Sequence, residues 1–255
     1  MKIQYASDLH LEFGDNGRYL GLGGIAPVGD ILVLAGDVSY LGDQGLMRHR
    51  FFDWCSEHFR ETYIVPGNHE FYGGYDIEQT MADYESQYRD NVRYLNNRCV
   101  MLEDTELFFT TLWTRISPLH LWTVQQGMND FRHGVLDGAR FCANDVDGLH
   151  KRCLEWLESA LKASTANRKV VVTHHCPTMR GEFNNYPGGA LNSAFMVDLD
   201  DFIETCGADY WLYGHTHYAG GSGTRIGQTQ LLCNQLGYVC YNEHRAFNGS
   251  AVIEV

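Results

Sequence analysis

Short apolar runs recur along this 255-residue chain, and each has the length of a β-strand rather than of a helix. Several are apolar at almost every position, which is typical of strands that are buried on both faces. Such strands need helices to cover them. The runs that predict strands are residues 2–6, 30–35, 61–65, 107–113, 169–173, 209–213, 230–233 and 250–255.

Helical patterns lie between several of these runs. The clearest covers residues 149–161, where apolar side chains recur at spacings of three and four and charged side chains occupy the opposite face. Asn144 or Asp145 precedes it as a suitable N-cap. Segments 44–60, 76–91 and 194–206 are also predicted to be helical. The alternation of strands and helices predicts an α/β fold, and the strand-rich last fifty residues predict a second, partly antiparallel sheet.

The chain shows no long linker, internal repeat or low-complexity tract, so we expect a single domain over residues 1–255. Residues 114–142 are the least periodic part. We expect them to form an irregular excursion on the substrate side of that domain rather than a domain of their own.

Composition narrows the classes of function. Lysine and arginine number 19 against 32 acidic residues, a formal charge of −13. That balance argues against binding to long nucleic acids or to anionic membranes, which require clustered basic residues. The apolar runs are too short to span a bilayer. The 8 cysteines include no CxxC pair, so we expect a cytoplasmic protein with reduced thiols.

Five of the predicted strands run directly into turns that carry Asp, Asn or His. In order, these turns read Ser7-Asp8-Leu9-His10, Gly36-Asp37, Gly67-Asn68-His69-Glu70, His174-His175 and Gly214-His215-Thr216-His217. The carboxyl ends of strands in open α/β sheets converge on one crevice, so we expect these side chains to meet. Within each Asp-x-His or His-x-His pair, an extended backbone would place both side chains on one face. Imidazole with carboxylate suits divalent transition metals, and the lack of cysteine disfavours a structural zinc site.

The ordered set of turns resembles the calcineurin-like metallophosphoesterase superfamily, and the resemblance spans residues 8 to 217. It implies a sandwich of two mixed β-sheets flanked by α-helices. It also implies a phosphoric ester hydrolase that uses two divalent transition-metal ions, chosen among Mn, Fe, Zn, Ni and Co. Two such ions about 3.5–4 Å apart can hold the attacking and the leaving oxygen of an in-line displacement.

The resemblance also implies a role for each matching residue. Asp8, His10 and His217 would hold one metal; Asn68, His174 and His215 would hold the other; Asp37 would bridge both. A metal-bridging hydroxide would be the nucleophile. His69 would act on the substrate as general acid or charge stabiliser.

Other residues near these motifs have less definite roles. His175 either makes an orienting hydrogen bond or contacts substrate. Asn68 is a further candidate for substrate contact. Arg132, in the 114–142 excursion, either holds a phosphate oxygen or is an ordinary solvated arginine. Glu70 either orients a ligand or caps the segment that follows it.

The chain departs from the family pattern after Asp37. Many relatives carry a second aspartate that orients the catalytic histidine, and this chain has Tyr40 at that position. What orients His69 is therefore left open. The phosphate-binding arginine of the protein phosphatases is also missing, which argues against that class of enzyme. We expect a phosphodiesterase or phosphatase acting on small molecules. The alternatives are a nuclease for short oligonucleotides and, from another class, a non-catalytic protein-binding scaffold.

Overall fold

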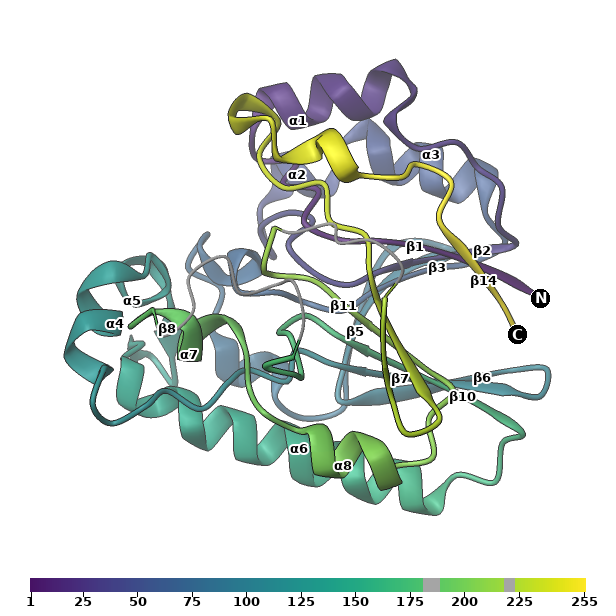
Figure 1. Ribbon diagram of the computed structural model, residues 1–255. Coiled ribbons are helices and arrows are strands. Elements are labelled where there is room, and N and C mark those ends of the chain that lie inside the picture. Colours follow the sequence, from purple (N-terminus) through teal and green to yellow (C-terminus); the bar gives the residue numbers. More distant parts are fainter. Residues whose placement is uncertain (181–188, 218–222) are drawn as a thin grey trace.

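The computed structural model describes residues 1–180, 189–217 and 223–255. Two six-stranded sheets pack face to face, and helices cover their outer faces (Figure 1). This arrangement confirms the predicted fold class. Within the described residues, no helix has the length and apolarity that a membrane span requires.

Each sheet has a parallel centre and antiparallel edges. The first runs in the order β14 (Val252–Glu254), β1 (Lys2–Ala6), β2 (Ile31–Leu34), β3 (Thr62–Ile64), β5 (Val92–Asn96) and β4 (Tyr84–Arg89). The second runs in the order β12 (Thr224–Ile226), β13 (Thr229–Cys233), β11 (Tyr210–Tyr213), β10 (Arg168–Thr173), β7 (Thr105–Thr110) and β6 (Arg98–Leu102). All eight predicted strands are present, and the second sheet is partly antiparallel as expected.

An apolar layer joins the two sheets. Ile31 and Val33 of β2 belong to the same buried cluster as Phe109 of β7 and Val170 and Val172 of β10. Every residue of β2 is buried, because its other face lies beneath helices. The continuous apolar runs of the sequence therefore reflect burial on both faces.

Helices seal the outer faces (Figure 1). On the first sheet lie α1 (Gly14–Tyr19), α2 (Gln44–Met47) and α3 (Arg50–His58), and on the second lie α6 (Val146–Ala163) and α8 (Asp200–Thr205). Phe52 of α3 is fully buried in the cluster that includes Leu32 and Leu34. Leu157 and Leu161 of α6 are buried against the second sheet, as the predicted apolar stripe requires.

The helix predicted over residues 76–91 is wrong. A short 3-10 turn (Ile77–Thr80) is followed by strand β4, which pairs antiparallel with β5. Tyr88 of β4 packs on Phe52 and Tyr94, and this cross-strand and cross-layer packing outweighs the local helical pattern. The segments at 44–60 and 194–206 each form two short helices, with α7 (Asn192–Phe195) preceding α8.

The excursion at residues 114–142 is more regular than predicted. It contains α4 (Leu121–Gly127), α5 (Asp130–His133) and a two-stranded sheet of β8 (Val135–Leu136) and β9 (Ala139–Arg140). Phe131 and Phe141 of this segment are buried in the cluster that also holds residues of α3 and β2. The excursion is therefore anchored to the main core.

Candidate metal centre

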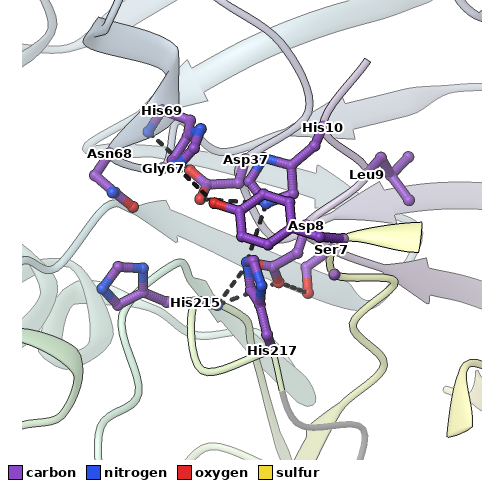
Figure 2. A network of polar contacts seen from close by, with 12 residues as sticks. Ser7, Asp8, Leu9, His10, Asp37, Gly67, Asn68, His69, His215 and His217 are labelled. Atoms are coloured by element: carbon purple, nitrogen blue, oxygen red, sulfur yellow. Dashed lines mark hydrogen bonds and ion pairs between the residues drawn. The ribbon is translucent and has the colours of Figure 1, made fainter. Parts of the chain in front are cut away.

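Residues of the turns after β1, β2, β3 and β11 lie close together (Figure 2). The turn after β10 joins them through His174. The acceptor atoms of Asp8, His10, Asp37 and His217 lie within 4.8 Å of one another, and those of Asp37, His174 and His215 do the same. Asn68 joins the second group, because its Oδ1 lies 3.0 Å from Nε2 of His174. The structure thus brings all seven predicted metal ligands together.

Asp37 belongs to both groups, and its two oxygens face different partners. Its Oδ1 lies 3.3 Å from Nε2 of His174, and its Oδ2 lies 3.9 Å from Nε2 of His10. The carboxylate therefore stands between the groups, as a bridging ligand must.

Two pairs of imidazole nitrogens face each other across these groups. Nε2 of His10 lies 3.0 Å from Nε2 of His217, and Nε2 of His174 lies 3.1 Å from Nδ1 of His215. In all four rings the other nitrogen faces an oxygen acceptor, namely Glu12, Glu243, the carbonyl of Ala35 and the carbonyl of Ala194. With their hydrogens directed to those acceptors, the facing nitrogens present lone pairs to each other. A cation between them suits that geometry.

The pKa values of the four paired histidines are shifted by burial and by the neighbouring carboxylates. Burial disfavours charge on His217, but hydrogen bonds to Asp8 and Glu243 outweigh it and raise its pKa to about 10. Burial lowers the pKa of its partner His10. In the second pair, burial again opposes charge on His174, but Asp37 raises its pKa to about 9, while burial holds the pKa of His215 well below its usual range. The surroundings of each pair therefore favour positive charge at one of its two rings, and a divalent ion between the rings would supply such charge.

Five of the seven ligand residues have left-handed backbone. The φ angles are 57° at Asp8, 48° at His10, 54° at Asp37, 75° at His215 and 50° at His217. Residues other than glycine rarely adopt this backbone conformation, and such strain concentrates at functional sites. The paired turns therefore meet through sharp local bends, and the extended pairing expected within Asp-x-His and His-x-His is wrong.

The glycines before the ligands allow this close approach. A Cβ on Gly67 would lie 2.2 Å from Oδ1 of Asp37, and one on Gly214 would lie 2.7 Å from Oδ2 of Asp8. No side chain fits at either position without moving a ligand.

Glu12 orients His69, and the sequence motifs missed it. Its Oε1 accepts a hydrogen bond from Nδ1 of His69 at 2.9 Å and lies 3.0 Å from Nδ1 of His10. Burial opposes protonation of His69, but the charge of Asp37 and the hydrogen bond to Glu12 raise its pKa. The available signal was a carboxylate two residues after a ligand histidine, placed between Leu11 and Phe13.

Asn68 is oriented by two residues outside the motifs. Its Nδ2 donates to Oδ1 of Asp130 at 2.7 Å and to the hydroxyl of Tyr72 at 3.0 Å. Its carbonyl oxygen therefore faces His174 and the metal cluster. Asp130 comes from the excursion at 114–142, which gives that segment a direct connection to the site.

The last part of the chain completes the site. Glu243 accepts from Nδ1 of His217 at 2.7 Å and from the backbone N–H of Tyr238. The Tyr238 ring packs on His10 and His217 at centroid distances of 4.7 and 4.5 Å, and its hydroxyl lies 3.3 Å from Nε2 of His69. Neither residue belongs to a turn that the sequence motifs identify.

A cavity of about 300 Å³ opens over the cluster. The described residues that line it are Asp37, Asn68, His69, Tyr72, Gly127, Met128, Asn129, Phe195, His215, Thr216, His217 and Tyr238. His69 thus reaches the cavity, together with aromatic side chains from three separate segments.

Two predicted substrate contacts are not among those lining residues. His175 is buried, its Nδ1 faces the carbonyl of Thr111 at 3.1 Å, and burial lowers its pKa to about 3. These contacts match the orienting role that was one of its two alternatives. Arg132 is exposed and donates to Oδ1 of Asn129 and to the carbonyl of Gln126.

Glu70 holds the backbone of two ligand turns in place. Its carboxylate is fully buried and accepts hydrogen bonds from the backbone N–H groups of Asp37, Val38, Ser39 and Gly67. It therefore ties the turn after β2 to the turn after β3, which is closer to orienting a ligand than to capping a helix.

The chain is similar to known proteins in both sequence and fold. The chain is 28% identical over 279 residues to an uncharacterized protein of Acanthamoeba polyphaga mimivirus, covering 99% of this chain and 96% of that protein. Its fold is similar to that of the phosphopantetheinyl hydrolase of Mycobacterium tuberculosis, with a TM-score of 0.69 at 16% identity over 99% of this chain and 95% of that one. The family model of the calcineurin-like phosphoesterases matches residues 1–219. The protein therefore belongs to the calcineurin-like phosphoesterases, a family of metal-dependent phosphoester hydrolases.

Proposed function

We propose that this protein hydrolyses phosphoesters of small molecules, preferably diesters, with two divalent transition-metal ions. The observation that carries the proposal is the pair of ligand clusters that share Asp37 and lie beside His69 under one cavity. Two ligand sets around one bridging carboxylate are what two-metal hydrolysis requires.

Asp8, His10 and His217 would hold one ion, Asn68, His174 and His215 the other, and Asp37 would contact both. When bound, such ions supply Lewis acidity and lower the pKa of a water molecule to the point where it becomes a nucleophile near neutral pH.

His69 supplies the proton for the leaving group. Its Nδ1 is directed to Glu12, so its Nε2 faces the cavity. As a water oxygen forms its bond to phosphorus, the ester P–O bond breaks and the proton on Nε2 passes to the departing oxygen. The water proton is released to solvent, and the products are a phosphate or phosphomonoester and an alcohol. The raised pKa of His69 favours the protonated form that this step needs.

The charge around the cavity favours diesters. Its described lining contains neither lysine nor arginine, and the sequence of residues 181–188 and 218–222 contains none either. Glu12, Asp130 and Glu243 stand behind the histidine and asparagine ligands. A monoester brings close to two negative charges and benefits most from a lysine or arginine on its free oxygens, whereas a diester brings one, so the lack of these side chains disfavours the monoester more. The same absence of cations disfavours a long nucleic acid.

The test compares bis(p-nitrophenyl) phosphate with p-nitrophenyl phosphate in the presence of Mn²⁺. We expect turnover of both, with a higher kcat/KM for the diester. Asp37→Asn should lose metal and activity together, whereas His69→Ala should keep metal and lose activity. Absence of turnover of either ester, with bound metal confirmed by elemental analysis, would contradict the proposal.

A further inference from the structure

We propose that Glu12 is a positioning residue with two roles at once: it holds the metal ligand His10 and the proton donor His69 through one carboxylate oxygen. The second role rests on the proposed hydrolytic function of His69. The first role concerns metal binding alone.

Glu12 is buried and contacts both histidines through the same oxygen. The two Nδ1 atoms lie 3.0 Å (His10) and 2.9 Å (His69) from the same Oε1. The two rings meet edge to face, with centroids 4.5 Å apart. The Glu12 side chain is only 5% exposed, so water has little access to replace it. Its second oxygen, Oε2, is buried and has no hydrogen-bond partner within the described part of the chain.

One shared oxygen fixes both rings because it settles which nitrogen carries the hydrogen. With Nδ1–H directed to Glu12, His10 presents Nε2 to His217, and His69 presents Nε2 to the cavity near the hydroxyl of Tyr238. Removing the acceptor frees each ring to rotate or to move its hydrogen to Nε2. Groups that orient a metal-ligating histidine typically change metal affinity or activity by about 10–100-fold.

The origin of the carboxylate distinguishes this arrangement. Glu12 lies two residues after His10 in the turn that follows β1, whereas Tyr40 occupies the turn that follows β2. The support of His69 therefore comes from the same turn as two metal ligands, Asp8 and His10. A displacement of that turn would disturb metal binding and proton donation together.

Three substitutions separate the hydrogen bonds from the charge and the volume. Glu12→Leu removes both acceptors. Glu12→Asp keeps the charge but is one methylene too short to meet both rings. Glu12→Gln can place its single oxygen where Oε1 lies and its NH₂ where Oε2 has no partner, so both hydrogen bonds can survive.

The first measurement is calorimetric titration of the metal-free protein with Mn²⁺. We expect Glu12→Leu to weaken one of the Mn²⁺ sites by about 10–100-fold, and Glu12→Gln to recover at least about tenfold of that loss. Glu12→Asp should fall near the leucine variant. Far-UV circular dichroism confirms that each variant is folded.

The second measurement is the dependence on the leaving group, using methyl p-nitrophenyl phosphate and methyl phenyl phosphate. Phenolate is the poorer leaving group and needs a proton more, and general acid catalysis contributes about 10²–10⁴-fold to rates. We therefore expect Glu12→Leu to reduce kcat/KM for the phenyl ester at least about tenfold more than for the nitrophenyl ester.

Two control variants separate the roles. His69→Ala should change the leaving-group dependence and leave Mn²⁺ affinity intact. Glu243→Leu removes the partner of His217 but keeps the bond between Glu12 and His69, so it should weaken Mn²⁺ binding and change the leaving-group dependence less than Glu12→Leu does. In the His69→Ala background, Glu12→Leu should still weaken Mn²⁺ binding but have no further effect on leaving-group selectivity.

The outcomes are distinct. If Glu12→Leu changes only one of the two measurements, or if Glu12→Gln is as damaged as Glu12→Leu in both, the shared-oxygen inference is overturned. If the wild-type protein hydrolyses neither diester, the proposed function and the second role of Glu12 both fail. The Mn²⁺ titration then still decides the first role by itself.

Discussion

Replacing Glu70 by glutamine should lower both the free energy of unfolding and the Mn²⁺ affinity, although the substitution changes only one heavy atom of the side chain. Oε1 of Glu70 accepts from the N–H groups of Val38 at 2.8 Å and Ser39 at 3.2 Å, and from the hydroxyl of Tyr94 at 3.2 Å. Oε2 accepts from the N–H groups of Asp37 at 2.9 Å and Gly67 at 2.7 Å. A glutamine replaces one acceptor oxygen by an NH₂ donor, whichever way the amide is turned.

The magnitude follows from counting the donors. Each oxygen of Glu70 serves two backbone N–H groups, so either orientation of the glutamine leaves two of them without an acceptor. Glu70 is fully buried, and a buried unsatisfied group costs about 1–3 kcal/mol. The expected loss is about 4 kcal/mol, within a range of about 2–6 kcal/mol. For a chain of this size, about 4 kcal/mol lowers Tm by roughly 8–16 °C.

Thermal unfolding of the metal-free protein, followed by circular dichroism, measures this loss, and Mn²⁺ titration measures its effect on the site. Glu78→Gln is the matched control, because Glu78 pairs with Arg152 at a side-chain exposure of 41%, and exposed pairs contribute about 0–1 kcal/mol. A Glu70→Gln protein whose Tm and Mn²⁺ affinity both equal those of the Glu78→Gln control would refute the reasoning.

Three further expectations test other parts of the structure. Gly67→Ala should abolish Mn²⁺ binding in calorimetry while the protein stays folded by circular dichroism, since its Cβ would displace Asp37. Leu157→Ala should lower the free energy of unfolding in urea by about 2–5 kcal/mol with unchanged Mn²⁺ affinity, because Leu157 packs in an apolar cluster that contains none of the metal ligands. Burial lowers the pKa of His150 below 6.5, so its contribution to stability is present at neutral pH and is lost as pH falls through 6.5. His150→Asn should therefore reduce the loss of unfolding free energy between pH 7.5 and 5.5, measured by urea unfolding at both pH values, and an unchanged pH dependence would exclude this role.

The convergence of these side chains was predictable from the sequence because each of the five turns follows a strand that is apolar at nearly every position, whereas the role of each residue came from the family resemblance. Strand order then places the five turns at one end of the sandwich, so no knowledge of side-chain packing was needed. Asp37 is the clearest example of this convergence, since it belongs to both groups and its two oxygens face His174 and His10.

The residues that orient the ligands were not predictable in the same way. Asp130 and Glu243 meet the site through tertiary packing, and neither local spacing nor strand pattern marks them. Glu12 carries one local signal, its position two residues after His10, but that spacing does not show that its carboxylate also contacts His69. The helix expected over 76–91 failed for the same reason. Tyr88 is a moderate helix former, but it packs against Phe52 and Tyr94 from a strand, and such contacts lie outside any short window of sequence.

The left-handed backbone at five ligand positions has a consequence for how this protein can change over time. At about 1 kcal/mol or more for each such residue, the five together cost an amount comparable with the lower end of the net stability of a typical domain, about 5 kcal/mol. Glycine at any of these positions would relieve strain and remove a ligand in the same step. A selection for thermal stability alone, without one for activity, would therefore accumulate glycines in these turns and yield a more robust protein with no metal centre.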